Sequence, residues 1–196
     1  MDICIDGIIG CGKSSVLEAL RSPDVTIVPE PLDEWGSVLE AFYNNPKGNA
    51  LLLQLTVLHH FHNRKKNTSG VVLWERSPSA SKNIFADMLH NSKTLSSMDY
   101  NAYCGFHEAM SWTPTCGIYI KCDPYTAYQR MTSRQYDCDR MVDMEYVESL
   151  HEQYETFIDK VYPLLHVVDG NQPLDAVVKD IKAILTSYSV SVDGTD

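Results

Sequence analysis

The pattern that most restricts the fold of this chain is a regular alternation of short apolar runs with longer helical segments. The apolar runs, which have the length of buried strands, lie at 2–6, 25–28, 70–75, 116–122 and 166–169. Helical patterns lie between them at 13–21, 33–44, 49–66, 79–91, 98–112, 124–135 and 143–160, and a last one covers 174–187. Because connections of this length join parallel strands, we expect an α/β fold in which helices sandwich a parallel sheet.

The chain has 196 residues, which is enough for one domain with its own hydrophobic core. It contains no internal repeat and no low-complexity tract. We therefore expect a single domain over residues 1–187, and a flexible tail over residues 188–196, where the sequence is YSVSVDGTD.

The net charge of −10 argues against binding to nucleic acid or to an anionic membrane, since both require a basic surface. No apolar run approaches the ~20 residues of a membrane-spanning helix. The chain opens on the strand-like MDICID rather than on a charged leader, and its six cysteines form no C-x-x-C pair. We expect a cytoplasmic protein with neither nucleic acid nor membrane as a partner.

A phosphate-binding pattern follows the first predicted strand. Residues 7–15 read GIIGCGKSS and fit G-x-x-x-x-G-K-[ST] directly before a predicted helix. In such a loop the backbone N–H groups point at phosphate oxygens, Lys13 reaches the β- and γ-phosphates, and the Ser14 hydroxyl ligates Mg²⁺. The predicted ATP or GTP site consists of Gly7, Ile8, Ile9, Gly10, Cys11, Gly12, Lys13, Ser14 and Ser15.

A second group of charged residues ends the third predicted strand, where VVLWERS (71–77) contains Glu75 and Arg76. An acid and a base are costly to bury at a strand end unless a ligand requires them. Ligands of open α/β sheets bind at the carboxyl ends of the strands. The sequence therefore predicts that the site lies at this edge of the sheet.

The acceptor of the phosphate is indicated by Glu30 and by a shortage of positive charge. Glu30 lies between two prolines, which restrict its backbone, and it is either a base for an attacking hydroxyl or a solvated turn acid. From Asp24 to Asn63, Lys47 is the only Lys or Arg, whereas a nucleotide acceptor normally meets an arginine clamp. The pattern favours a nucleoside acceptor, although Arg76 leaves a nucleoside monophosphate open.

Several motifs follow one another along the chain, namely GIIGCGKSS, EPLDEW (30–35), FYNNPKG (42–48) with a following glutamine, ERS (75–77), an arginine-rich segment, and a D-G-N turn (169–171). This ordered set resembles the deoxyribonucleoside kinases of the thymidine kinase 2, deoxycytidine kinase and insect nucleoside kinase type. Stretches without gaps cover most of residues 2–171. The resemblance implies a P-loop kinase fold with a five-stranded parallel sheet, a homodimer formed through helices, and ATP and Mg²⁺ as donor and cofactor.

The resemblance also implies catalytic roles. Glu75 and Ser14 would hold Mg²⁺, Arg76 would contact the 5′-oxygen of the acceptor and the transferring phosphoryl group, and Glu30 would accept the 5′-hydroxyl proton. Together with Lys13, these groups supply the positioning and charge stabilisation that phosphoryl transfer needs. Asp6 stands before the loop where the family has Glu.

The acceptor pocket follows from the same resemblance. Gln54 would form paired hydrogen bonds to a base edge, Phe85 would stack on the base, and Trp35 would line the wall. Tyr43 and Asp139 would hold the 3′-hydroxyl. The family usually has Glu at the position of Asp139. The remaining predicted contacts of the acceptor are Leu53, Val57 and Ser81.

The choice of base is indicated by two positions. Relatives that prefer deoxycytidine and purines carry an Arg and an Asp where this chain has Phe61 and Ser81. Uncharged residues there resemble the pyrimidine-preferring branch, which has room for a 5-methyl group. We expect thymidine to be the preferred acceptor, with deoxycytidine also accepted.

Residues 127–140 resemble a lid that closes over ATP. Arg130 and Arg134, four residues apart on one predicted helix face, would reach the donor phosphates. Tyr136 replaces a third lid arginine, for which Arg140 would compensate. The D-G-N turn, formed by Asp169, Gly170 and Asn171, would border the adenine.

The sequence thus predicts an ATP- and Mg²⁺-dependent deoxyribonucleoside kinase that acts on a pyrimidine nucleoside. One alternative is a thymidylate-type nucleoside monophosphate kinase, which shares the loop and the lid but needs an arginine clamp for the acceptor. Another is a nucleotide-switch or binding protein, which would need neither pocket aromatics nor a base-pairing glutamine.

Overall fold

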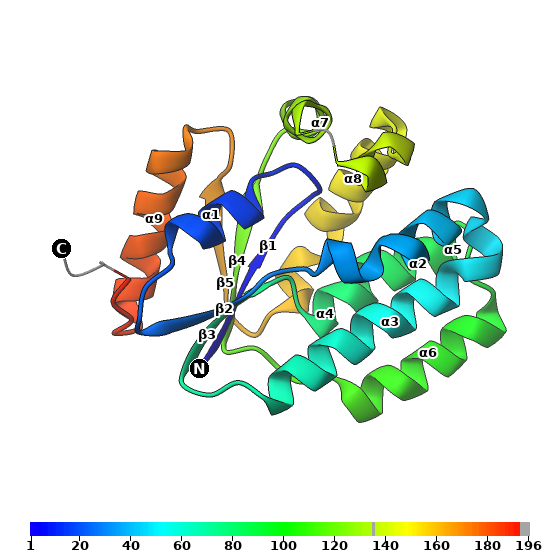
Figure 1. Cartoon of the computed structure of the whole chain (residues 1–196), viewed down its shortest axis with the longest axis horizontal. Helices are drawn as coiled ribbons and strands as arrows, with labels where there is room; N and C mark the ends of the chain where they lie inside the picture. Colours follow the sequence, from blue (N-terminus) through cyan, green and yellow to red (C-terminus); the bar gives the residue numbers. More distant parts are fainter. Residues whose placement is uncertain (135, 193–196) are drawn as a thin grey trace.

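The computed structural model of the chain describes residues 1–134 and 136–192. Within these residues, one sheet contains five parallel strands in the order β2-β3-β1-β4-β5 (Figure 1). The strands are β1 (Asp2–Asp6), β2 (Val25–Val28), β3 (Val71–Glu75), β4 (Cys116–Lys121) and β5 (Leu165–Asp169). The predicted five-stranded parallel α/β fold is confirmed.

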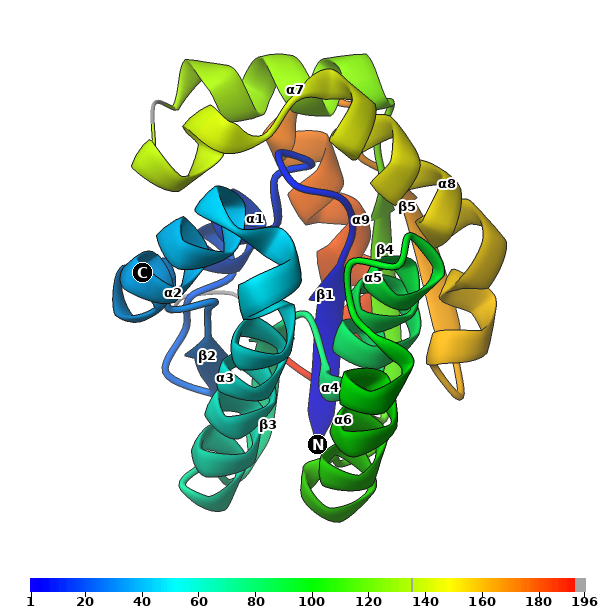
Figure 2. The ribbon, with the colours of Figure 1, turned by 90° about the vertical axis from the view of Figure 1, so that its right-hand side faces the viewer.

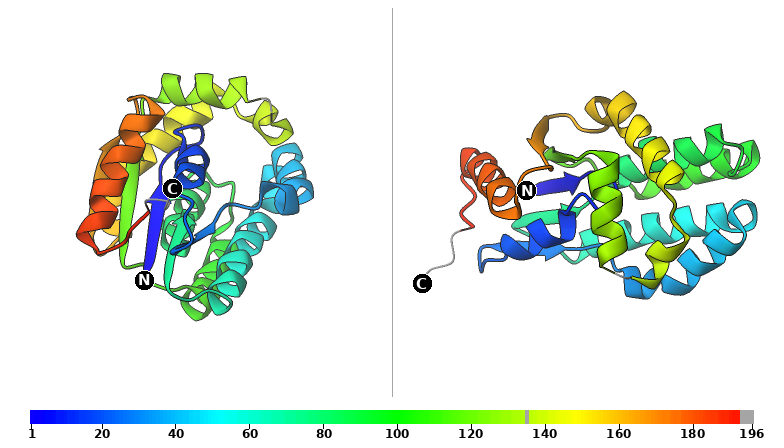
Figure 3. Two further views of the ribbon diagram at one scale, coloured as in Figure 1. Left: turned by 60° about the vertical axis from the view of Figure 1, so that its left-hand side comes forward. Right: turned by 90° about the horizontal axis from the view of Figure 1, so that it is seen from above.

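Helices cover both faces of the sheet, which is why the strands read as continuous apolar runs. On one face lie α1 (Lys13–Ala19) and α9 (Leu174–Ser187), and the larger helical layer lies on the other face (Figures 1 and 2). This second layer contains α2 (Leu32–Asn44), α3 (Pro46–Lys66), α6 (Ser97–Met110) and α8 (Met144–Val161). Figure 3 shows α7 (Pro124–Ser133) and the 3₁₀ helix η2 (Asp137–Met141) lying across the end of the molecule towards α2.

Several helices begin at a side-chain cap, and two of them, α3 and α6, start earlier than the apolar pattern predicted. The Asn45 side chain accepts a hydrogen bond from the Gly48 N–H (3.3 Å) and precedes Pro46 at the first position of α3. In the same way, Ser96 and Asp143 cap α6 and α8.

The single helix predicted over 79–91 is divided into three segments. These are α4 (Pro78–Ala80), a π-helical turn η1 (Ser81–Ala86), and α5 (Asp87–Asn91). A π turn accommodates an additional residue and rotates the side chains that follow, and it is frequent at functional sites. The apolar period alone does not reveal it.

The chain end differs from the expected tail. Val190 and Val192 are buried and belong to the core cluster of the sheet, so residues 188–192 are a packed part of the domain rather than a flexible segment. The remainder of the predicted tail, residues 193–196, lies outside the described residues. Among the helices of residues 1–134 and 136–192, none is long and apolar enough to span a membrane.

Candidate active site

The loop between β1 and α1 adopts a conformation that only glycine adopts easily. Gly12 has φ +106° at the N-cap of α1, and Gly10 has φ +82°. A Cβ atom at Gly10 would lie 2.1 Å from the Ala127 carbonyl oxygen, so the loop packs directly against α7. The glycines of GIIGCGKSS are therefore required both for the loop shape and for its contact with the predicted lid.

Lys13 and Ser14 connect this loop to the end of β3. The Lys13 ammonium group donates to the carbonyl oxygens of Gly7 (3.3 Å) and Ile8 (3.0 Å), at the loop interior. The Ser14 hydroxyl donates to the Glu75 carboxylate (3.0 Å), and the Glu30 N–H donates to its other oxygen (3.4 Å). Glu75 thus joins the phosphate loop to the segment that carries Glu30.

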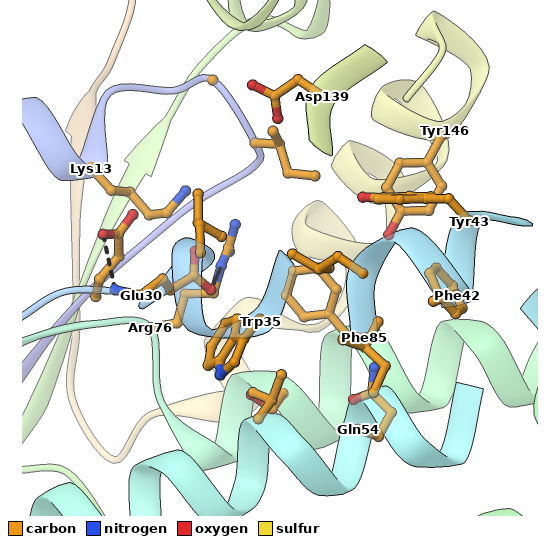
Figure 4. Close-up of a pocket in the computed structure, with 18 of the residues that line it drawn as sticks. Lys13, Glu30, Trp35, Phe42, Tyr43, Gln54, Arg76, Phe85, Asp139 and Tyr146 are labelled. Atoms are coloured by element: carbon orange, nitrogen blue, oxygen red, sulfur yellow. Dashed lines mark hydrogen bonds and ion pairs between the residues drawn. The ribbon is translucent and has the colours of Figure 1, made fainter. Parts of the chain in front are cut away.

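Arg76 lies at the centre of the charged groups. Its Nε donates to the Glu30 carboxylate (2.9 Å), and its Nη1 donates to the Gly7 carbonyl (2.7 Å) and the Asp6 carboxylate (3.1 Å). The residue is only 4% exposed, and its backbone has φ +65°, an uncommon conformation outside glycine. Figure 4 shows Lys13, Glu30 and Arg76 together at one end of the pocket.

The environment of Glu30 favours a carboxyl group that can accept a proton. Its side chain is 16% exposed. Burial raises the pKa of the Glu30 carboxyl above its ordinary value; Arg76 opposes this rise and Glu75 adds to it. A base of this kind is closer to the working pH than a solvated carboxylate.

The rest of the pocket is apolar with few polar groups. The Phe85 ring lies 4.8 Å from the guanidinium carbon of Arg76, and Trp35 also lines the pocket (Figure 4). Gln54 is 4% exposed, and its carbonyl oxygen Oε1 makes no hydrogen bond to the residues that the structure describes. A buried amide oxygen without a partner is costly, so a ligand is the natural partner for it.

The structure brings all the predicted acceptor contacts to this pocket. Its lining includes Glu30, Trp35, Tyr43, Leu53, Gln54, Val57, Arg76, Ser81, Phe85 and Asp139, together with Ile9, Gly10, Lys13, Ser14, Glu75 and Arg134 of the donor and metal predictions. Phe61, expected near the base, is instead buried in the core beside Trp74 and Trp112.

Some residues that line the pocket were not predicted. Leu39 and Phe42 lie four and seven residues after Trp35 on α2, and Leu89 lies four after Phe85, so helical spacing could have identified them. Leu32 lies three before Trp35 on the same helix. Tyr146 comes from α8 and had no local signal, because only the packing of α8 brings it to the pocket.

The two arginines of the predicted lid, Arg130 and Arg134, contact different groups. Arg130 donates to the Gly170 carbonyl (2.7 Å), whereas Arg134 forms a two-point ion pair with the Asp139 carboxylate (2.7 and 3.1 Å). Because α7 ends at Ser133, Arg134 leaves the helix and lies at the acceptor pocket. Arg130 and Arg134 thus make different contacts in this structure, and their predicted role at the donor phosphates stays a prediction.

A second hollow lies between the phosphate loop and α9. Of the predicted donor residues, Cys11, Gly12, Ser15, Arg130 and Gly170 line it. Gly7, Ile8, Asp169 and Asn171 line neither hollow; the Asn171 side chain accepts from the Asp123 N–H (2.9 Å), which ties the D-G-N turn to the start of α7.

The Mg²⁺ prediction is compatible with the groups present. The Ser14 hydroxyl and a Glu75 carboxylate oxygen lie 3.0 Å apart at the phosphate loop. Hydroxyl and carboxylate oxygens are the hard donors that Mg²⁺ prefers, and nucleotide phosphates complete such sites. The donor set therefore fits this ion.

Comparisons with known proteins agree on one family. A sequence profile described as deoxynucleoside kinase matches residues 3–192. A protein named as a kinase, 029R of Invertebrate iridescent virus 3, is 35% identical over 187 residues, which are 94% of this chain and 95% of the viral protein. Mitochondrial thymidine kinase 2 of Homo sapiens is 29% identical over 172 residues, which are 81% of this chain and 64% of that protein.

A solved structure is similar over nearly the whole chain. The structure of deoxyadenosine kinase from M. mycoides, with products dCMP and a flexible dCDP bound, has a TM-score of 0.85 and 25% sequence identity. The match covers 96% of this chain and 100% of that one.

Proposed function

The chain belongs to the deoxynucleoside kinase family, and from this premise we propose that it phosphorylates the 5′-hydroxyl of pyrimidine deoxynucleosides, thymidine first and deoxycytidine second. As a family member it is an ATP-dependent deoxynucleoside kinase. Family membership leaves the base open, because its similar proteins include a thymidine kinase and a deoxyadenosine kinase.

The observation that carries the binding of a nucleobase is the buried, unpartnered carbonyl oxygen of Gln54 in the pocket. A glutamine amide offers one acceptor and one donor side, which match N3 of a pyrimidine and its neighbouring exocyclic group. The part of the pocket lined by Leu39, Phe42 and Leu89 is apolar, which suits a 5-methyl group. The uncharged Ser81 is consistent with this assignment.

The charged end of the pocket supports a direct transfer from ATP. With the acceptor 5′-oxygen beside Glu30, the carboxylate takes the hydroxyl proton while the oxygen attacks the γ-phosphorus in line. Arg76 stabilises the charge on the transferring group, and Lys13 holds the donor phosphates. Ser14 and Glu75 would hold Mg²⁺, which supplies positive charge at the phosphates when bound.

We also infer a homodimer. Its support is the resemblance of the motif set to dimeric relatives, together with exposed apolar side chains on α3 and α6, namely Leu52, Met98 and Phe106.

The test is the rate of ADP formation with Mg²⁺-ATP and thymidine, deoxycytidine, deoxyadenosine, deoxyguanosine or dTMP, together with identification of each product. We expect the highest kcat/KM for thymidine. Glu30→Gln should lower kcat for thymidine by about 100-fold or more, because the base is lost. Glu34→Gln is the matched control, since Glu34 is exposed and pairs only with Arg64 (3.3 Å) among described residues.

The outcomes separate the parts of the proposal. A higher kcat/KM for a purine nucleoside would contradict the choice of base and leave the family activity intact. Turnover of dTMP alone would contradict a nucleoside acceptor. Full activity of Glu30→Gln would remove Glu30 from the mechanism.

A further inference from the structure

A fully buried carboxylate lies directly behind the catalytic pocket. Asp6, the last residue of β1, is 0% exposed and precedes the phosphate loop. Its Oδ1 accepts hydrogen bonds from the Gly7 N–H (2.8 Å), the Tyr154 hydroxyl (2.6 Å) and Arg76 Nη1 (3.1 Å). Its Oδ2 accepts one from the Tyr162 hydroxyl (2.6 Å). A buried charge with this many partners is costly to assemble, which points to a function for it.

The two tyrosines form two different arms of this network. Tyr154, on α8, donates to Asp6 and also accepts a short hydrogen bond from Arg76 Nη1. Tyr162, just after α8, donates to Asp6 and accepts from the Ser77 hydroxyl (3.0 Å), and it makes no hydrogen bond to Arg76. Burial raises the pKa of Tyr154 well above its ordinary value, so its hydroxyl stays protonated and remains a donor to Asp6.

With Tyr154, both Nε and Nη1 of the Arg76 guanidinium have hydrogen-bond partners within the protein. Nε is held by Glu30, and Nη1 is held by Gly7, Asp6 and Tyr154. The Phe85 ring packs on its face at 4.8 Å. Nη2 makes no hydrogen bond to the described residues, so the fixed plane leaves this nitrogen for the substrate.

We propose that Asp6 and Tyr154 are positioning residues for phosphoryl transfer, which hold the Arg76 guanidinium in a fixed plane so that Nη2 meets the acceptor oxygen and the transferring phosphoryl group. This rests on the proposed role of Arg76 in the kinase reaction. A cation that is already oriented needs no reorganisation when charge develops, and therefore stabilises the transition state more than the bound substrates. Because Asp6 also binds the Gly7 N–H, the same carboxylate ties the orientation of Arg76 to the phosphate loop.

The alternative is that Asp6 only fastens β1 to α8. The two tyrosines distinguish these roles, since each donates one hydrogen bond to the same carboxylate but only Tyr154 contacts Arg76. Tyr154→Phe and Tyr162→Phe each remove one hydroxyl and preserve the ring. Both should lower the melting temperature to a similar degree, because each leaves Asp6 with one donor fewer.

The experiment measures kcat, both KM values and the melting temperature of the two variants on the deoxynucleoside that the wild type uses best. We expect Tyr154→Phe to lower kcat about tenfold, with KM for ATP and for the nucleoside changed less than about threefold. Tyr162→Phe should retain kcat within about threefold of wild type. Asp6→Asn, which keeps the shape and removes the charge, should lower kcat at least as much as Tyr154→Phe.

Equal kcat in the two tyrosine variants, whether both fall or both stay high, would overturn the positioning role, and so would a loss confined to KM. If Asp6→Asn does not fold, the comparison of kcat between Tyr154→Phe and Tyr162→Phe decides between the two roles. A wild type that prefers a purine nucleoside would contradict the proposed base but not this inference, because the same comparison is then made with that substrate. Retained kcat in an Arg76→Lys variant would overturn the role of Arg76 itself, and with it this inference.

Discussion

At the scale of single residues, Arg76 shows how one side chain can combine charge and geometry. Two of its nitrogens contact carboxylates from different strands and loops, Asp6 and Glu30, and its backbone adopts φ +65°. A strained conformation of this kind persists only where the surroundings hold it, and it is frequent at active sites. The Glu75–Arg76 pair, which looked costly from sequence alone, is therefore satisfied by partners far away in the chain.

Gln54 gives a prediction at the same scale. Gln54→Leu keeps the approximate volume of the side chain and removes both hydrogen-bonding groups. We expect kcat/KM for thymidine to fall by about 10- to 100-fold, mainly through KM, because the edge of a bound base would lose its partners. Steady-state kinetics with thymidine check this.

The control for the buried Gln54 is Gln153, a partly buried glutamine. Gln153 donates to the Asn83 carbonyl (3.2 Å) and does not line the pocket. Gln153→Leu should leave KM for thymidine close to wild type. A Gln54→Leu variant with unchanged kcat/KM on every deoxynucleoside would remove Gln54 from base recognition.

At the scale of elements, one face of α3 serves both the pocket and its wall. Leu53, Gln54 and Val57 line the pocket, and His60, on the same face as Leu53 and Val57, packs edge-on against Trp35 with ring centroids 5.4 Å apart. Trp35 itself lines the pocket, so the ring of His60 supports its wall from behind. The π turn η1 similarly brings Ser81 and Phe85 into the pocket from the other side.

His60 should make the free energy of unfolding of the protein depend on pH. Burial lowers the pKa of His60 to about 4, and its Nε2 has no hydrogen-bond partner among the described residues. The unfolded chain binds the proton near the ordinary value of about 6.5, so the free energy of unfolding should decrease as the pH falls from about 6.5 to about 4.

The measurement is urea unfolding of wild type and His60→Phe at several pH values in that range. The variant keeps a ring against Trp35 and has no proton to bind. We expect the wild type to lose on the order of 1 to 3 kcal/mol more than the variant between these pH values. Parallel pH profiles of stability in the two proteins would show that His60 does not titrate with folding.

At the scale of the whole molecule, the pocket joins parts of the chain that belong to different layers. The phosphate loop and β3 supply the charged end, α2 and α3 supply the apolar wall, and η2 and α8 supply Asp139 and Tyr146. Because α8 carries both Tyr146, which lines the pocket, and Tyr154, which contacts Arg76, this helix connects the pocket wall to the charged end of the pocket. These contributions meet at the carboxyl ends of β1, β2 and β3, as expected for an open α/β sheet.

The proposed homodimer is tested at this scale. Phe106 is exposed on α6, so Phe106→Glu places a charge on the surface inferred to associate. We expect the wild type to elute as a dimer in size-exclusion chromatography with light scattering, and Phe106→Glu to shift towards a monomer, because burying an unpaired carboxylate is unfavourable. Tyr125→Glu, on an exposed aromatic of α7, should leave the mass unchanged. A monomeric wild type would contradict the dimer.

Much of the fold and part of the site followed from local patterns. The strands could be predicted because each is a short apolar run. The phosphate loop could be predicted because its backbone shape requires glycines at fixed positions and its phosphate chemistry requires Lys13. The positions of Glu30, Glu75 and Arg76 followed from the rule that strands of an open sheet present their ligands at the carboxyl ends. All of these predictions rest on residues that are close together in the sequence.

Only the tertiary structure decided which distant residues meet. Arg76 contacts Asp6 from 70 residues away, and Tyr154 contacts Asp6 from 148 residues away. The π turn in 79–91, the burial of Phe61, the packing of residues 188–192 and the different contacts of Arg130 and Arg134 were likewise not evident from sequence. Apolar periodicity reports which face of an element is buried, but not what covers it, and the buried network behind Arg76 exists only where β1, β3 and α8 pack together.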